Sequence, residues 1–193
     1  MLGILEWIGN RNLKQRIAEG IRINLIPGLV LWIMGVCLVA IYYLGEFSRP
    51  WFNQIIILKE TYGFAYSAVS TCFFGGLIPY VFMQLTGRDR LKGLWSGVIF
   101  LGYWAIRGID VDAFYRLQAM VFGTEVDSLT IVSKVLVDQF VYCVVWASPI
   151  TALFYTWREA GFSLKQWKGS KTWSELFDMI LIFTVTTWVV WIP

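Results

Sequence analysis

Long apolar runs alternate with short polar stretches along most of this chain. A helix needs about 20 mostly apolar residues to cross the hydrocarbon core of a bilayer. The pattern predicts five such spans, at residues 24–45, 62–85, 93–106, 129–157 and 174–192. We therefore expect an all-α fold, a polytopic transmembrane helical bundle of about five spans.

The N-terminal segment, residues 1–23, follows a different pattern. Leu13, Ile17 and Ile21 would share one helical face. Polar and charged residues would occupy the opposite face: Arg11, Gln15, Glu19 and Arg22. This arrangement predicts an amphipathic helix on the membrane surface, with a break near Gly9–Asn10. A cleaved signal peptide fits poorly, because the basic residues follow the apolar ones and no small-residue cleavage site is present.

These patterns divide the chain into three predicted parts. Residues 1–23 form the interfacial helix, and residues 24–61 form one span with its connector. Residues 62–193 form a membrane domain of four spans. Small residues in its first two spans suit close helix packing: Ser67, Ser70, Ser96 and Gly97.

The composition agrees with a membrane protein. Hydrophobic residues make up 58% of the 193 residues and charged residues only 15%, against about 25% in soluble domains. The net charge of +3 is small and dispersed, so nucleic acid is not an expected partner. The lipid bilayer is the expected partner. A homo-oligomer and a larger membrane complex remain open alternatives.

Missing residue types narrow the chemistry. The chain has no histidine, which excludes histidine zinc sites, histidine-ligated haem and histidine general bases. Cys37, Cys72 and Cys143 lie far apart inside apolar segments and are interpreted as small core residues. No nucleophile with an adjacent base is apparent, so we expect no metal site, no cofactor and no enzyme activity.

Lysine and arginine are distributed unequally between the predicted loops. Eleven of them fall in the N-terminal segment and in the loops after the second and fourth spans. The other loops and span edges hold five: Arg49, Lys59, Arg107, Arg116 and Lys134. Positive charge accumulates on the cytoplasmic side of membrane proteins. The bias therefore predicts a cytoplasmic N-terminus and an external C-terminal end.

Tryptophan positions agree with this arrangement. Six tryptophans lie at or near the ends of predicted spans: Trp51, Trp146, Trp157, Trp173, Trp188 and Trp191. Indole rings favour the boundary between lipid and water, so we interpret these residues as lipid anchors.

Charged residues near the start of the fourth span are the first candidate site. Lys134 and Asp138 are four residues apart and would share a helix face that continues to Tyr142, with Gln139 in an adjacent row. Pro149 then predicts a kink. Two interpretations stay open. Lys134 and Asp138 form a structural ion pair near the interface, or these side chains line an aqueous path.

The stretch RGIDVDAFYR, residues 107–116, is the second candidate. Within a helix, Arg107 could pair with Asp110 and Asp112 with Arg116. A solvated loop is favoured, because four charges in ten residues are unusual at bilayer depth. If helical, these residues would extend the polar face toward Asp138. Upstream, Pro79 within FFGGLIP predicts a kink or packing site rather than a cofactor loop.

The fourth span also carries a family resemblance. Lys134, Asp138, Gln139 and Pro149 match a Lys-x-x-x-Asp-Gln element followed by proline, which resembles the Mpv-seventeen family, the twenty-two-kilodalton peroxisomal membrane proteins. Further likeness across residues 62–193 comes from Gly76, Gln84, Gly108 and Ile192–Pro193. Departures from the family pattern fall at Ile78–Pro79, Gln118–Ala119 and Trp188–Val189. The chain is thus similar to a divergent, bacterial member.

The resemblance implies a small all-helical membrane protein with a weakly selective channel as its leading activity. We therefore expect a channel-like role in small-solute permeation, with Lys134, Asp138 and Gln139 lining or bracing the path. The alternative is a non-transporting structural or accessory subunit of a membrane complex. The expected location is the bacterial inner membrane, with an organellar membrane as the alternative.

Overall fold

The computed structural model describes residues 13–85 and 93–191, whose regular structure is helical throughout. The first helices are α2 (Leu13–Leu44), η1 (Glu46–Ser48), α3 (Arg49–Tyr62), α4 (Phe64–Thr71), η2 (Cys72–Leu77), α5 (Ile78–Leu85) and α6 (Leu94–Phe122). The later ones are α7 (Ser128–Leu136), η3 (Val137–Ala147), α8 (Ser148–Glu159), α9 (Leu164–Trp167) and α10 (Trp173–Trp191). The predicted all-α class is confirmed for these residues.

The chain forms two compact units. Unit 1 contains the chain up to Ile33 and from Val126 onward, and unit 2 contains Met34–Glu125. Helix α2 contributes its first part to unit 1 and its last part to unit 2. These units do not follow the predicted boundary after residue 61. That boundary concerns membrane topology and family likeness, and it stays a prediction.

Helix α2 includes the last part of the predicted N-terminal surface helix. It runs without a break through 32 residues, so residues 13–23 are its first turns rather than a separate surface helix. The Asn24 amide donates to the Gly20 carbonyl at 2.8 Å within the helix, instead of capping a new one. The expected break at Gly9–Asn10 lies outside the described residues, and the surface position of the segment stays a prediction.

Three helical runs of the described residues are long and apolar enough to cross a membrane. They are Asn24–Leu44, Phe64–Leu85 and Ser128–Glu159. The chain therefore carries membrane-type helices, although fewer than the five expected. The predicted third and fifth spans are the helices α6 and α10. Helix α6 carries four charged residues close together, within residues 107–116. Cys37 is exposed on α2, so the core interpretation is wrong for this cysteine.

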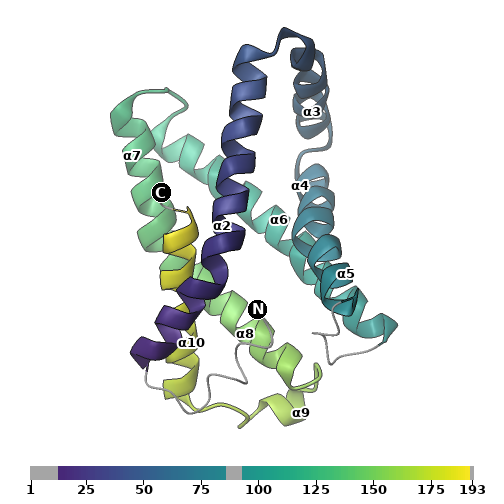
Figure 1. Cartoon of the computed structure of the whole chain (residues 1–193), viewed down its shortest axis with the longest axis vertical. Helices are drawn as coiled ribbons and strands as arrows, with labels where there is room; N and C mark the ends of the chain where they lie inside the picture. Colours follow the sequence, from purple (N-terminus) through teal and green to yellow (C-terminus); the bar gives the residue numbers. More distant parts are fainter. Residues whose placement is uncertain (1–12, 86–92, 192–193) are drawn as a thin grey trace. The chain divides into compact units, whose positions relative to one another are not determined.

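Unit 2 is built by α6 crossing the line of α4, η2 and α5 (Figure 1). Glycines make this crossing close. A Cβ atom on Gly108 would lie 2.1 Å from the Ser67 carbonyl oxygen, so only glycine fits there. At Gly97 a Cβ atom would lie 3.1 Å from the Tyr80 ring. Ser67 and Gly97 are buried here, which confirms their predicted packing role.

Helix α6 continues through residues 107–116, so the loop interpretation is wrong. The helix ends only at Gly123, whose φ of 81° suits glycine. The charges are accommodated because both expected ion pairs form, Arg107 with Asp110 and Arg116 with Asp112. Pairing one turn apart lowers the cost of placing these charges on a packed helix.

Both predicted kink prolines follow a widened helical segment. Pro79 is the second residue after η2, and Pro149 is the second residue after η3, and both segments are π-helical. The last bonds of these segments join the Ile78 N–H to Phe73 and the Ser148 N–H to Cys143, five residues back. Proline lacks an N–H and crowds the carbonyl four residues back, so a wider turn relieves the clash.

Unit 1 has its core between α8 and α10. Ala152, Met179 and Ile182 are nearly or fully buried there, and the Tyr155 and Phe183 rings stack with centroids 5.9 Å apart. The first part of α2 also packs on α10. A Cβ atom on Gly20 would lie 3.1 Å from the Thr186 hydroxyl oxygen.

Asp127 begins the helical run from α7 to α8. Its carboxylate accepts the N–H groups of Leu129 and Thr130 at 2.9 and 3.0 Å, and the Thr130 hydroxyl at 2.6 Å. The hydroxyl bond, and then the backbone bonds, lower the pKa of Asp127 below its ordinary value. The positive N-terminal end of the helix dipole also stabilises an ionised carboxylate at this position.

We predict that Gly108→Ala separates α6 from α4, because the new Cβ atom would meet the Ser67 carbonyl. The free energy of unfolding should fall by about 2–3 kcal/mol. Gly102→Ala is the matched control, since nothing lies within 4 Å of its Cβ position on the same helix. It should be neutral or stabilise by up to about 1 kcal/mol. Thermal unfolding of the detergent-solubilised protein measures both, and equal effects would contradict this helix crossing.

Candidate functional site

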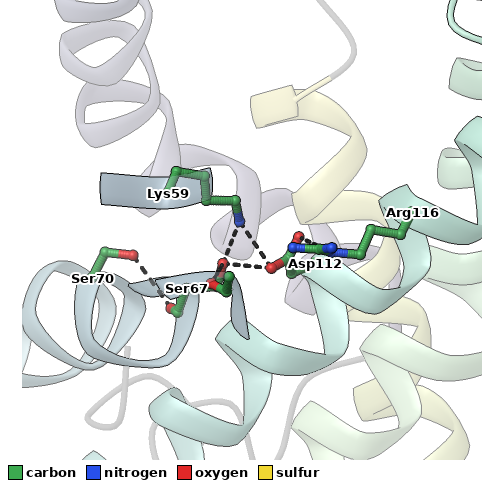
Figure 2. Close-up of polar contacts among 6 residues, drawn as sticks. Lys59, Ser67, Ser70, Asp112 and Arg116 are labelled. Atoms are coloured by element: carbon green, nitrogen blue, oxygen red, sulfur yellow. Dashed lines mark hydrogen bonds and ion pairs between the residues drawn. The ribbon is translucent and has the colours of Figure 1, made fainter. Parts of the chain in front are cut away.

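A charged cluster in unit 2, the Asp112 cluster, consists of Lys59, Ser67, Asp112 and Arg116 (Figure 2). The Lys59 ammonium lies 2.9 Å from Asp112 Oδ2. The Ser67 hydroxyl donates to the same oxygen at 2.8 Å and accepts a hydrogen bond from Lys59. Arg116 Nε lies 3.2 Å from Asp112 Oδ1. Both carboxylate oxygens of Asp112 are therefore occupied.

Local backbone geometry assembles the cluster from three helices. Asp112 lies one turn after Gly108, where α6 comes closest to Ser67 of α4. Gly63 joins α3 to α4 with a φ of 50°, and its N–H caps the carbonyl of Lys59 at 2.8 Å. Lys59 is thereby placed one turn before the junction and Ser67 one turn after it.

The cluster carries a net positive charge. The Asp112 side chain is 8% exposed, whereas Lys59 and Arg116 are 39% and 48% exposed. A buried carboxylate without a cation would be costly, so the two cations compensate for its loss of water. The Arg116 guanidinium also lies over the Phe64 ring, 4.7 Å from its centroid. This arrangement can hold α3, α4 and α6 together and keep a positive charge at a fixed position.

Arg107 and Asp110 form a second pair on α6. Their side chains are 11% and 23% exposed, so this pair is also largely buried. Of the sequence-predicted site residues in unit 2, the structure thus joins Arg107 to Asp110 and Asp112 to Arg116. Asp112 and Asp138 belong to different units, and the polar face expected to join them stays a prediction.

Unit 1 contains the other predicted group, Asp138 and Gln139, in the π-helical segment η3. The Gln139 amide donates to Asp138 Oδ2 at 2.9 Å. Gln139 is buried, and its Oε1 accepts no hydrogen bond from the described residues. Its backbone carbonyl accepts the indole N–H of Trp188 at 3.0 Å. A buried amide oxygen without a donor is costly and marks a place where water or a polar solute would be stabilised.

The remaining predicted residues are distributed along the same helical run. Lys134 lies in α7 and Tyr142 in η3, both half-buried, and Pro149 opens α8. The partner shown for Asp138 is Gln139, and a pair between Lys134 and Asp138 stays a prediction. Tyr142 follows Asp138 by four residues, and both lie within η3.

The sequence interpretation missed three contributors. Lys59 falls between two predicted spans, and no local sequence pattern indicates its pairing with Asp112. Trp188 was interpreted as a lipid anchor, but its indole instead bonds Gln139. Arg16 pairs with Asp178 at 3.0 Å, joining α2 to α10 within unit 1. The sequence shows a positive charge near the start of α2 and a negative charge near the start of α10, but it does not show that the two lie close together.

The cluster does not provide a metal site. Across residues 13–85 and 93–191, no three cysteine, aspartate or glutamate side chains come together as metal ligands. The chemistry that the described groups support is charge pairing and hydrogen bonding of a solute or water.

No protein-family model, no curated protein and no solved structure matches the chain. The resemblance of the Lys134–Pro149 stretch to the Mpv-seventeen family therefore stays a prediction.

We predict that Asp112→Asn destabilises unit 2, because Lys59 and Arg116 lose their shared negative partner. The free energy of unfolding should fall by about 2 kcal/mol, less than for a fully buried pair because both cations can turn toward water. Glu125→Gln, an equal change of charge at an exposed position, is the control and should leave the unfolding midpoint unchanged. Equal midpoints for both variants would show that the Asp112 cluster contributes nothing to stability.

Proposed function

We propose that this chain is an integral membrane protein with a channel-like role in the permeation of small solutes. The observation that carries the proposal is the Asp138–Gln139 pair inside the apolar run Ser128–Glu159. Groups of this kind are expensive within a membrane span and usually face water or a polar interior. The free Oε1 of Gln139 supplies an acceptor for a passing polar solute.

Two ion pairs support the five-span arrangement within this proposal. Lys59 and Asp112 come from the two regions between predicted spans that the charge bias assigns to the external side. Arg16 and Asp178 come from the N-terminal segment and the start of α10, both assigned to the cytoplasmic side. In each pair, the two residues belong to segments that are predicted to lie on the same side of the membrane. This agrees with α6 and α10 each crossing the membrane. A bacterial inner membrane with a cytoplasmic N-terminus is part of the proposal.

The family resemblance belongs to the same proposal. The Asp138 and Gln139 that carry the observation above also carry the match to the Mpv-seventeen pattern, with Lys134 and Pro149. A divergent bacterial relative of that family would have this polar element in a membrane span, and its channel-like activity would concern the same two side chains.

We expect purified protein in lipid vesicles to accelerate the osmotic swelling caused by small uncharged solutes. Gln139→Leu should return swelling to the rate of protein-free vesicles, because it replaces the acceptor with an apolar group of similar size. Asp138→Asn should also reduce it, since the carboxylate that orients Gln139 is lost. Stopped-flow light scattering measures these rates.

Lys165→Gln serves as the control, because Lys165 is exposed on the short helix α9. It should swell at the unaltered rate. Unaltered protein that gives the rate of empty vesicles would refute permeation. If Gln139→Leu and Asp138→Asn both keep the full swelling rate and elute from size-exclusion chromatography like the unaltered protein, the path does not pass these two side chains.

The alternative function is a non-transporting subunit of a membrane complex, and one observation favours it. Helix α2 leaves nearly all side chains from Leu25 to Leu44 exposed, so a partner helix could pack there as well as lipid. Extraction in native lipid discs, followed by mass determination, distinguishes the two functions. A fixed stoichiometric partner would favour the subunit, and the isolated chain or its homo-oligomer would favour permeation.

A further inference from the structure

Helix α3 has an exposed apolar surface that nothing in unit 2 covers. None of its 14 residues is buried. Four large side chains at helical spacing form one stripe: Trp51, Ile55, Leu58 and Tyr62. Their exposed fractions run from 44% to 74%, and Phe47 in the preceding turn is 80% exposed. A contiguous exposed apolar stripe of this kind marks a surface that contacts a membrane or another molecule.

The opposite face of α3 is polar. Arg49, Asn53 and Glu60 fall on it at helical spacing, and all three are exposed. Ile56 and Ile57 flank this polar stripe. The helix is therefore amphipathic, but neither its apolar stripe nor its polar stripe faces the rest of unit 2.

Two contacts determine how α3 is rotated about its axis. Lys59 reaches Asp112 and Ser67, and the Phe52 ring meets Tyr42 with centroids 5.2 Å apart. Phe52 and Lys59 are seven residues apart and so share one side of the helix. That side lies between the two stripes. The Trp51 stripe is consequently directed away from the Asp112 cluster.

The neighbouring segments identify the environment of α3. Candidate spans precede and follow it, Asn24–Leu44 and Phe64–Leu85. Helix α3 is about 21 Å long and cannot cross a hydrocarbon core of about 30 Å. If both neighbours cross the bilayer, both ends of α3 lie on the same side of the membrane. An amphipathic helix in that position belongs at the boundary between lipid and water.

We propose that α3 is an interfacial helix whose Trp51 stripe is seated in lipid while Arg49, Asn53 and Glu60 face water. The Lys59–Asp112 contact then anchors this boundary helix to the crossing of α4 and α6. This inference rests on the proposed membrane location, but it requires no permeation activity. The proposed occupant of this stripe is the lipid bilayer rather than a second protein chain.

The test places an environment-sensitive fluorescent amino acid at single positions of the full chain by codon suppression. Ile55 and Leu58 report the apolar stripe, Asn53 and Glu60 report the polar one, and Leu38 on α2 is the lipid reference. The protein is reconstituted in vesicles of phosphatidylcholine and phosphatidylglycerol. Brominated acyl chains quench probes in lipid, and added iodide quenches probes in water.

We expect the probes at Ile55 and Leu58 to lose fluorescence in brominated vesicles and to resist iodide. The probes at Asn53 and Glu60 should lose it with iodide. Iodide quenching of all four would place α3 in water and overturn the inference. Quenching of all four probes by brominated lipid would place α3 inside the hydrocarbon core, which would also overturn the inference. Quenching of the stripe probes by neither agent would indicate a covering protein, which also overturns it.

The probe at Leu38 separates failure of this inference from failure of the membrane location. If Leu38 is quenched by brominated lipid while the stripe probes are not, the interfacial position of α3 is wrong and the membrane location stands. If Leu38 is quenched only by iodide, the α2 span itself is wrong. The flux measurements are independent of both results.

Discussion

Neutralising charge on largely apolar helices is the constraint on which this structure depends. Asp112 satisfies it by lying between Lys59 and Arg116, with Ser67 completing the shell of its carboxylate. The contact needs α6 and α4 to come very close, which Gly108 permits one turn earlier. The cluster thereby connects α3 to the closely packed helices α4 and α6. In unit 1, Arg16 and Asp178 meet the same constraint between α2 and α10.

Proline has a parallel effect in the two units. Each unit has a long apolar helical run in which a π-helical segment ends two residues before a proline, η2 before Pro79 and η3 before Pro149. The wider turns change which side chains share a face. Segment η3 contains the hydrogen-bonded pair Asp138 and Gln139, and the Gln139 backbone carbonyl accepts the indole N–H of Trp188. Widened turns are often found at functional sites, which agrees with the permeation proposal.

Much of the local structure could be predicted from the sequence. Hydrophobic runs located the helices, and the pairs Arg107–Asp110 and Asp112–Arg116 followed from residue spacing. Local patterns could not reveal that Lys59 meets Asp112, because the two are separated by all of α4 and α5. They also could not show that α2 continues through residues 13–23, since a surface helix and the first turns of a span have the same backbone. The prolines indicated a kink, but the widened turn before each depends on packing.

Sidedness tests the proposed membrane arrangement most directly, in which the Asp112 cluster lies outside and the connection from α8 to α10 lies inside. A short epitope can be inserted after Gly45, Gly123 or Gly169, which lie between helices. Antibody access is then compared in intact spheroplasts, which lack an outer-membrane barrier, and in permeabilised ones. The account predicts that epitopes at Gly45 and Gly123 are reached in intact spheroplasts and that the one at Gly169 needs permeabilisation. Epitopes at Gly123 and Gly169 on the same side would contradict it, because the run from α7 to α8 would then not cross the membrane.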